Sequence, residues 1–298
     1  MFFRPTQTTS SAVENWQQSH WWRGHGIIRA LDFIISYKVH VTLLIFLMVM
    51  NRWWDWSDPQ GWLAAAIFSS VVTFVYLINK VTDVKEDQIN TASLPMPPQY
   101  ARRVTWVALF LVLWPLPFIY NRPGVLALYL FIAIGQGVFY NFKLPLLGFR
   151  TKQIWGVKTF MAAVIIAVTP SFVHSLWVYD KIWPWDWWIF AYAQLTFMVA
   201  SVIWDVRDIE GDRAVGVRTL PNTLPLWATR LVCWGMLIAA GWVRFEAVPV
   251  AQFPVLIGLS TNALVVLFMH PRRHRYFFHA YILVWFGLLL YPPVSRLF

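Results

Sequence analysis

Two groups of oxygen-bearing side chains recur at helical spacing, and each group follows a long apolar run. In the first group, Asn79, Asp83 and Asp87 stand at i, i+4 and i+8 directly after the apolar run from Gly61 to Ile78. On an α-helix these three side chains fall within a sector of about 80°. Amide and carboxylate oxygens are hard ligands that suit Mg²⁺ and its phosphate partners. Taken alone, the pattern also fits a solvated helix end with ordinary charges.

The second group repeats this arrangement later in the chain. Asp205, Asp208 and Asp212 stand at i, i+3 and i+7 after the apolar run from Trp187 to Ile203. They share one helical face if the helix continues, although Gly211 can end it early. Two acidic faces, each at the end of an apolar helix, can close on a shared cluster of cations.

At these residues the chain resembles the UbiA superfamily of membrane prenyltransferases. The first group matches the motif N-D-x-x-D-x-x-x-D, and the second matches D-x-x-D-x-x-G-D-x-x-x-G-x-x-T-L-P through Gly216 to Pro221. A segment with Tyr140 to Lys143 and Arg150 to Lys152 also looks familial, and the resemblance covers roughly residues 30 to 295. There are two departures. Lys80 stands where the family has Asp, and the Arg-Pro that usually follows the first motif is absent.

The resemblance implies transfer of an isoprenyl group from a prenyl diphosphate to a lipophilic acceptor, through an allylic carbocation and with release of diphosphate. It implies Mg²⁺ as cofactor, because the leaving group gathers negative charge. The expected metal ligands are Asn79, Asp83, Asp87, Asp205, Asp208 and Asp212. Asp83 and Asp208 are expected to be catalytic, as is Tyr140, whose ring can stabilise a carbocation.

A count of charges predicts that basic side chains must join this site. Five Asp residues, a diphosphate ester of about −3 and two Mg²⁺ leave about four negative charges to be compensated. The candidates are Lys143, Arg150, Lys152 and Arg218, with Lys152 as the first choice because it best matches the family's basic residue. His40 is a further candidate, as a proton acceptor.

Composition excludes a soluble domain. The chain has 298 residues, of which 58% are hydrophobic and 13% charged, and its formal net charge is +10. Such an apolar excess indicates a polytopic membrane protein. Nucleic acid is not expected as a partner, because the basic residues lie between apolar runs and form no single patch. Cys233 is the only cysteine, which excludes an intramolecular disulfide.

The hydropathy pattern predicts an all-α bundle of about nine transmembrane helices around a central cavity. The expected spans lie near 37–52, 61–79, 103–120, 123–142, 154–174, 187–205, 226–243, 249–269 and 277–294. Residues 1–28 are expected to form a cytoplasmic tail, and 29–298 the membrane domain. Lys and Arg are about three times as frequent in one set of loops, which predicts a cytoplasmic N-terminus, cytoplasmic acidic motifs and a C-terminus on the opposite side.

Two alternatives to prenyl transfer remain open. A terpene cyclase of the same fold would capture the cation with a double bond of the same molecule, and Lys80 with the absent Arg-Pro favours it. A transporter could bind a cation at the acidic residues. However, transporter sites usually lie near the midplane at broken helices, and these residues stand at span ends on one side.

Overall fold

The computed structural model describes residues 38–53, 56–89, 98–143, 148–247, 252–271, 277, 280–281 and 284. Within these residues the chain is helical throughout, as predicted, with no strand. The longer elements are α3 (Val39–Trp53), α4 (Pro59–Thr82), α6 (Pro98–Leu113), α9 (Val157–Tyr179), α10 (Pro184–Arg207), α13 (Leu226–Ala247) and α14 (Gln252–Phe268). The shorter ones are α5 (Val84–Ile89), α7 (Leu116–Ile119), α8 (Pro123–Leu130), η1 (Phe131–Phe139), η2 (Thr151–Gln153), α11 (Ile209–Ala214) and α12 (Leu220–Thr223).

In the described part of the chain, five helical segments are long and apolar enough to cross a membrane. They are Pro59–Thr82, Gln99–Ile119, Val157–Tyr179, Pro184–Arg207 and Leu226–Glu246. Three further apolar helices, at Val39–Met50, Pro123–Phe139 and Gly258–Phe268, are shorter. Each of these eight segments overlaps a predicted span. The ninth predicted span, 277–294, and the tail, 1–28, fall almost wholly outside the described residues, so the count of nine is not confirmed.

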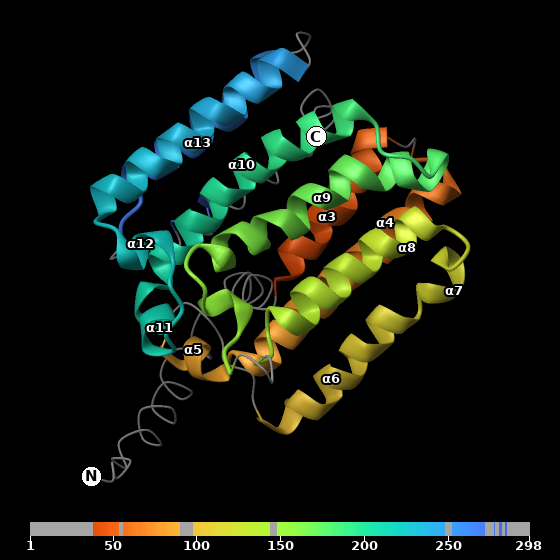
Figure 1. Ribbon diagram of the computed structural model, residues 1–298, viewed down its shortest axis with the longest axis horizontal. Coiled ribbons are helices and arrows are strands. Elements are labelled where there is room, and N and C mark those ends of the chain that lie inside the picture. Colours follow the sequence, from red (N-terminus) through yellow and green to blue (C-terminus); the bar gives the residue numbers. More distant parts are fainter. Residues whose placement is uncertain are drawn as a thin grey trace.

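The candidate spans divide into central and peripheral helices (Figure 1). Of the most apolar 18 residues, 67% are buried in α4, 72% in α9 and 61% in α10. The corresponding shares are 17% in the span formed by α6 and α7 and 28% in α13. In Figure 1, α6 and α13 lie at opposite edges of the bundle with α9 and α10 between them. The central helices therefore carry the side chains that meet inside the protein.

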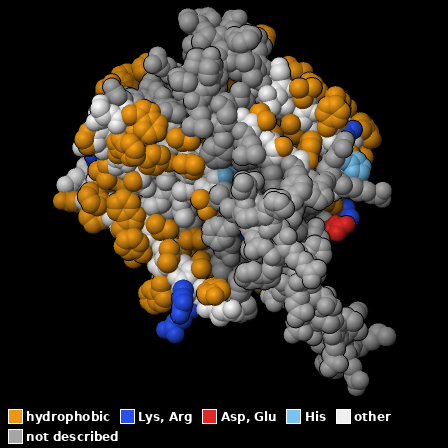
Figure 2. Space-filling model, turned by 180° about the vertical axis from the view of Figure 1, so that it is seen from behind, with side chains coloured by type: hydrophobic (Ala, Val, Ile, Leu, Met, Phe, Trp, Pro, Cys, Tyr) orange, Lys and Arg blue, Asp and Glu red, His pale blue; other side chains and the backbone are white. Residues whose placement is uncertain are grey.

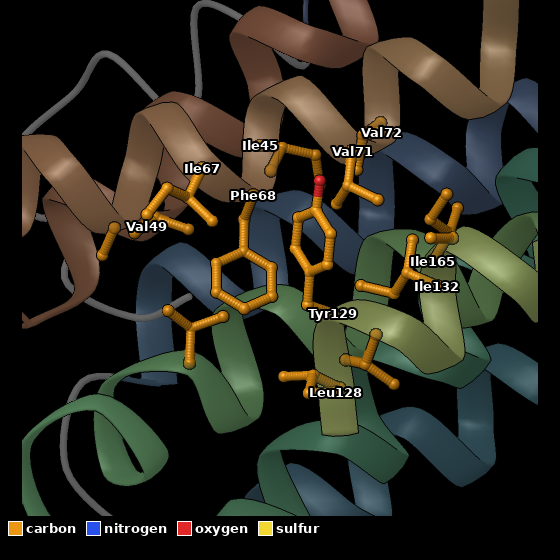
Figure 3. Close-up of a cluster of buried hydrophobic side chains, with 14 of the residues drawn as sticks. Ile45, Val49, Ile67, Phe68, Val71, Val72, Leu128, Tyr129, Ile132 and Ile165 are labelled. Carbon is orange, nitrogen blue, oxygen red and sulfur yellow. The ribbon is translucent and has the colours of Figure 1, made fainter. Parts of the chain in front are cut away.

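One hydrophobic core joins α3, α4, α8, η1 and α9. Tyr129 of α8 is fully buried there, with its ring 6.4 Å from that of Phe68 and with Ile45 and Val71 beside it (Figure 3). Its hydroxyl donates to the backbone oxygen of Val112 at 2.9 Å, which satisfies the polar end of a buried aromatic side chain. This core fixes η1, and through η1 the position of Tyr140.

Large apolar side chains cover much of the described surface (Figure 2). On α6, Trp106 and Phe110 are exposed, and on α13 Ile238 and Trp242 are exposed. Soluble proteins rarely expose contiguous apolar patches of this extent. The peripheral helices therefore present a surface suited to lipid.

Both acidic helices break at an aspartate, which differs from the predicted continuous helical faces. α4 ends at Thr82 with Asp83 as its cap, and α10 ends at Arg207 with Asp208 as its cap. The short helices α5 and α11 begin at the next residue. The backbone NH of Asp87 still donates to Asp83, and that of Asp212 to Asp208, each at 2.9 Å. Gly211, named as a residue that can end the second helix early, lies inside α11, and the break comes three residues before it.

Candidate functional site

The two acidic motifs meet because α5 and α11 lie side by side at one end of the bundle (Figure 1). Lys38, just before α3, interacts electrostatically with both motifs. Burial and then Arg207 lower the pKa of its ammonium to about 7, while Asp208 and Asp87 act in the opposite direction. One carboxylate from each motif thus acts on the same ammonium group. The predicted convergence of the motifs is consistent with this arrangement.

The first-motif cluster consists of Asp83, Glu86, Arg150 and Lys152. Lys152 Nζ lies 2.5 Å from Asp83 Oδ1 and 2.9 Å from Glu86. Arg150 contacts the same two carboxylates, with Nη1 2.9 Å from Asp83 Oδ1 and Nη2 2.8 Å from Glu86 Oε1. Burial, and then the charge of Asp83, raise the pKa of Glu86. Two cations and two carboxylates compensate each other within this cluster.

The second-motif cluster consists of Lys158, Thr159, Asp205 and Asp212. Lys158 Nζ lies 2.6 and 2.7 Å from the two oxygens of Asp212 and 3.3 Å from Asp205 Oδ1. Thr159 donates its hydroxyl to Asp205 Oδ2 at 2.6 Å. Burial raises the pKa of Asp212 to about 7; Lys158 opposes this shift and Asp205 adds to it. Here one ammonium group faces two carboxylates.

One short segment supplies the cations of both clusters. Arg150 caps the 3-10 turn η2, Lys152 lies within it, and Lys158 lies in the first turn of α9. Gly156 separates them with φ of +73°, a left-handed conformation that favours glycine. Gln153 Nε2 also donates to the backbone oxygen of Val215 at 2.9 Å, which ties η2 to the loop that follows α11.

Two further ion pairs use the remaining motif carboxylates. Lys80 Nζ lies 2.6 Å from Asp87 Oδ2, and both side chains are largely buried. Arg207 grips Asp208 bidentately, with Nε and Nη2 at 2.6 and 2.7 Å from its two oxygens. Burial alone would raise the pKa of the Asp208 carboxyl, but the charge and hydrogen bonds of Arg207 act against burial, and the pKa is lowered. Lys80, which stands where the family motif has its first Asp, is therefore a partner of a motif carboxylate.

Tyr140 lies at the boundary between the two clusters. It follows directly on η1, a π-helix, and its backbone NH donates to Gly135, five residues earlier, at 3.2 Å. Its ring centroid is 5.9 Å from Lys152 Nζ. Burial raises the pKa of its phenol well above the usual value, so the hydroxyl stays neutral. π-helical turns are frequent at functional sites, and here one places the predicted aromatic side chain.

Asn79 supplies a test of whether the predicted Mg²⁺ fits these residues. Its side-chain oxygen is buried and accepts no hydrogen bond among the described residues. Such an orphaned oxygen is costly unless a ligand satisfies it, and it is of the kind that Mg²⁺ binds. Within the described part of the chain, no three Asp, Glu, His or Cys side chains form a ready-made metal group. The carboxylates are instead separated by the basic side chains that pair with them.

Two of the predicted diphosphate ligands stay outside the ion-pair network. Lys143 and Arg218 are exposed, and neither forms an ion pair with a described residue. Arg218 contributes through its backbone, since its carbonyl accepts from Gly156 at 3.2 Å. Of the four predicted basic residues, Arg150 and Lys152 are those that the fold brings to an acidic motif.

Sequence reasoning missed Glu86 and Lys158 as members of the site. Glu86 stands at i+3 from Asp83, a spacing that places it near the same helical face. Lys158 lies at the start of a buried apolar span, where a charged side chain is costly and needs a partner. Both signals are present in the sequence, although the excess of Lys and Arg in this set of loops also follows from membrane topology.

His40 lies near the second motif. It is buried on α3, and its ring centroid is 6.4 Å from that of Trp204, the residue before Asp205. Trp204 also forms cation–π interactions with Lys38 and Arg207, whose charged groups lie 4.9 and 4.5 Å from its ring centroid. The role of His40 as a proton acceptor stays a prediction.

A family comparison decides the class of this site. The model of the UbiA prenyltransferase family matches residues 39–280. The chain belongs to the UbiA prenyltransferase family. Membership agrees with the predicted resemblance, and together with its apolar helices it makes the chain a multi-pass integral membrane protein.

Two curated relatives carry names of different activities, a phytyltransferase and a cyclase. The chain is 26% identical over 185 residues to a probable homogentisate phytyltransferase from Oryza sativa subsp. japonica, covering 59% of this chain and 45% of that protein. It is 28% identical over 208 residues to the diterpene cyclase eriG from Hericium erinaceus, covering 66% and 61%. The matches thus span about half to three fifths of the length of these relatives.

Solved structures confirm the fold. A UbiA homolog from Aeropyrum pernix K1 superposes with a TM-score of 0.59 at 14% identity, covering 85% of this chain and 98% of that one. A structure of digeranylgeranylglyceryl phosphate synthase superposes with a TM-score of 0.52 at 15% identity, covering 89% and 97%. At these identities the likeness concerns the UbiA fold alone.

Proposed function

We propose that this UbiA protein transfers an isoprenyl group from a prenyl diphosphate to a lipophilic acceptor, in a reaction that depends on Mg²⁺. Two observations carry the proposal: the contact between α5 and α11, which brings the two acidic motifs together, and the buried oxygen of Asn79, which accepts no hydrogen bond among the described residues. Mg²⁺ would be held by Asn79 and by the motif carboxylates Asp83, Asp87, Asp205, Asp208 and Asp212. When bound, it supplies Lewis-acid polarisation of the diphosphate oxygens.

The basic side chains have a separate task in this proposal. Arg150 and Lys152 would stabilise the charge that the leaving diphosphate gains as the carbon–oxygen bond breaks. Arg150 can do so bidentately, whereas Lys152 acts as a point charge. Both are already held next to Asp83, so little reorganisation is needed when the leaving group develops its charge.

Tyr140 would serve the carbon side of the reaction. Its buried ring is close enough to Lys152 to face the same substrate, and its phenol stays neutral. An aromatic face stabilises a desolvated cation by up to about 2 kcal/mol. The allylic chain would lie along the apolar central helices, and the lipophilic acceptor would enter from the bilayer.

The reaction can be tested with purified protein in detergent. Prenyl diphosphates of several lengths and a panel of aromatic, quinone-precursor, tetrapyrrole and isoprenoid acceptors are supplied with Mg²⁺, and products are followed by mass spectrometry. We expect inorganic diphosphate and a prenylated acceptor in equal amounts, both lost when the metal is chelated. Turnover that is indifferent to metal removal, or transport without diphosphate release, would overturn the proposal.

A second candidate is a terpene cyclase, favoured by the eriG relative and by Lys80 at the family's Asp position. In that case the cation is captured by a double bond of the same chain and no acceptor is needed. Incubation with prenyl diphosphate alone distinguishes the two. A cyclic hydrocarbon or alcohol formed without acceptor assigns the cyclase, and a strict requirement for an acceptor assigns the transferase.

A further inference from the structure

The side chains of the second-motif cluster differ in their exposed fraction, and this difference bears on metal binding. The side chains of Asp212 and Asp205 are 1% and 5% exposed, whereas that of Lys158 is 17% exposed. The ammonium group of Lys158 contacts both oxygens of Asp212 and one oxygen of Asp205. The side chains of the two aspartates are thus less exposed than that of Lys158, whose ammonium group contacts three of their four oxygens.

The fourth oxygen of this pair also has a partner. Asp205 Oδ2 accepts the hydroxyl of Thr159, the residue next to Lys158, at 2.6 Å. The first turn of α9 therefore satisfies every oxygen of the two carboxylates. A divalent cation that binds here must take oxygens that Lys158 already holds.

We propose that Lys158 is a resident counterion of Asp205 and Asp212 that competes with divalent metal for their oxygens and so sets the metal affinity of the second motif. The inference rests on the proposed function, in which these carboxylates are metal ligands. One ammonium group balances only one of two negative charges. The site is therefore left with a net attraction for a cation, but one weakened by a like charge at close range.

The first-motif cluster offers a contrast inside the same molecule. Asp83 and Glu86 are matched by two cations, Arg150 and Lys152. Asp83 uses only Oδ1 for both contacts, and among the described residues no basic side chain contacts its Oδ2. Lys158, by comparison, holds both oxygens of Asp212. Competition with metal is therefore most direct at the second motif.

Binding of Mn²⁺ to the purified protein without substrate tests this inference, since free Mn²⁺ is measured directly by electron paramagnetic resonance. Removing one like charge at contact distance should tighten Mn²⁺ binding by Lys158→Met at least about tenfold. Lys158→Arg, which keeps the charge, should stay near the wild-type affinity. Lys181→Met, which changes a lysine outside both clusters, serves as the matched control and should leave the affinity unchanged.

A second pair of variants covers the case in which Lys158→Met fails to fold with two unpaired carboxylates. Asp212→Asn and the double variant Lys158→Met with Asp212→Asn each keep one carboxylate, Asp205. Competition predicts tighter Mn²⁺ binding in the double variant than in Asp212→Asn.

The outcomes separate the two proposals. Equal Mn²⁺ affinities with and without Lys158, in proteins that do bind Mn²⁺, overturn the inference and leave the proposed function standing. Absence of Mn²⁺ binding in wild type and all variants, together with turnover that ignores metal, overturns the proposed function itself.

Discussion

The two acidic motifs are similar in sequence spacing but differ in how the protein neutralises them. Asp83 and Glu86 in the first-motif cluster face two basic side chains, whereas Asp205 and Asp212 in the second-motif cluster face one. Both sets of cations come from the same segment, Arg150 to Lys158. Under the proposed function, the first-motif cluster holds two cations that can stabilise an anionic leaving group. In the second-motif cluster one negative charge is left without a counterion, and a bound metal ion would balance it.

The largest expected effect is on turnover. Asp83→Ala and Asp208→Ala each remove a metal ligand that matters most as the leaving group develops charge, so each should lower kcat about ten-thousandfold or more, or about 5 kcal/mol in activation free energy. Product formation with Mg²⁺ in detergent measures this. Circular dichroism and gel filtration should show retained folding. Normal turnover in either variant would break the assignment of both motifs to one site.

The next effect is on stability, and it distinguishes the clusters. Lys158→Met leaves two buried carboxylates without a cation and should cost about 3–5 kcal/mol, the range for breaking a buried pair. Lys152→Met should cost less, because Arg150 still contacts both Asp83 and Glu86. Thermal unfolding of both variants in metal-free detergent gives the order. A larger loss for Lys152→Met would reverse the comparison.

Lys38 adds a pH dependence at the point where the motifs meet. Its pKa is about 7 in the folded protein against an ordinary value of 10.5, with burial as the first cause. Between these values the unfolded chain binds the proton and the folded chain does not, so stability should rise with pH from about 7 to 10.5. The slope is at most about 1.4 kcal/mol per pH unit. Thermal unfolding of Lys38→Met across this range should lack that slope, and parallel curves for the two proteins would contradict it.

The smallest expected effect concerns Glu86, a carboxylate that competes with diphosphate for Arg150 and Lys152. Glu86→Gln removes that competitor and should tighten binding of inorganic diphosphate in the absence of metal by about 1 kcal/mol, the scale of one hydrogen bond. Isothermal titration calorimetry measures the change. Glu86→Asp, which keeps the charge, is the control. Weaker binding by Glu86→Gln would mean that Glu86 chiefly holds the two cations in position.

The sequence predicted the all-helical fold, and it pointed to several side chains that the fold brings together, for physical reasons. Apolar runs long enough to span a bilayer left little choice of architecture, and their overlap with the helices is close. Spacing also identified Asp83 and Asp208, because carboxylates at helix ends stand out in a membrane protein. Arg150 and Lys152 lay in the loop where cations were needed.

Other features depend on tertiary structure and escaped prediction. The helix breaks at Asp83 and Asp208 depend on how neighbouring helices pack, since no Pro or Gly marks them at those residues. Lys80 shows the same limit. In the sequence it is only a departure from the family's Asp, whereas in the structure Asp87, in the short helix that follows the break at Asp83, pairs with it.

The most direct test of the central claim is a structure of the protein with Mn²⁺ and a non-cleavable prenyl diphosphate analogue, with anomalous scattering used to locate the metal. The account predicts metal ions bonded at about 2.1–2.2 Å to carboxylates of both motifs, including Asp83 and Asp208, and all in contact with one diphosphate. It also predicts Arg150 and Lys152 on that diphosphate. A diphosphate bound away from α5 and α11, with every motif carboxylate still paired to its lysine or arginine and free of metal, would contradict it.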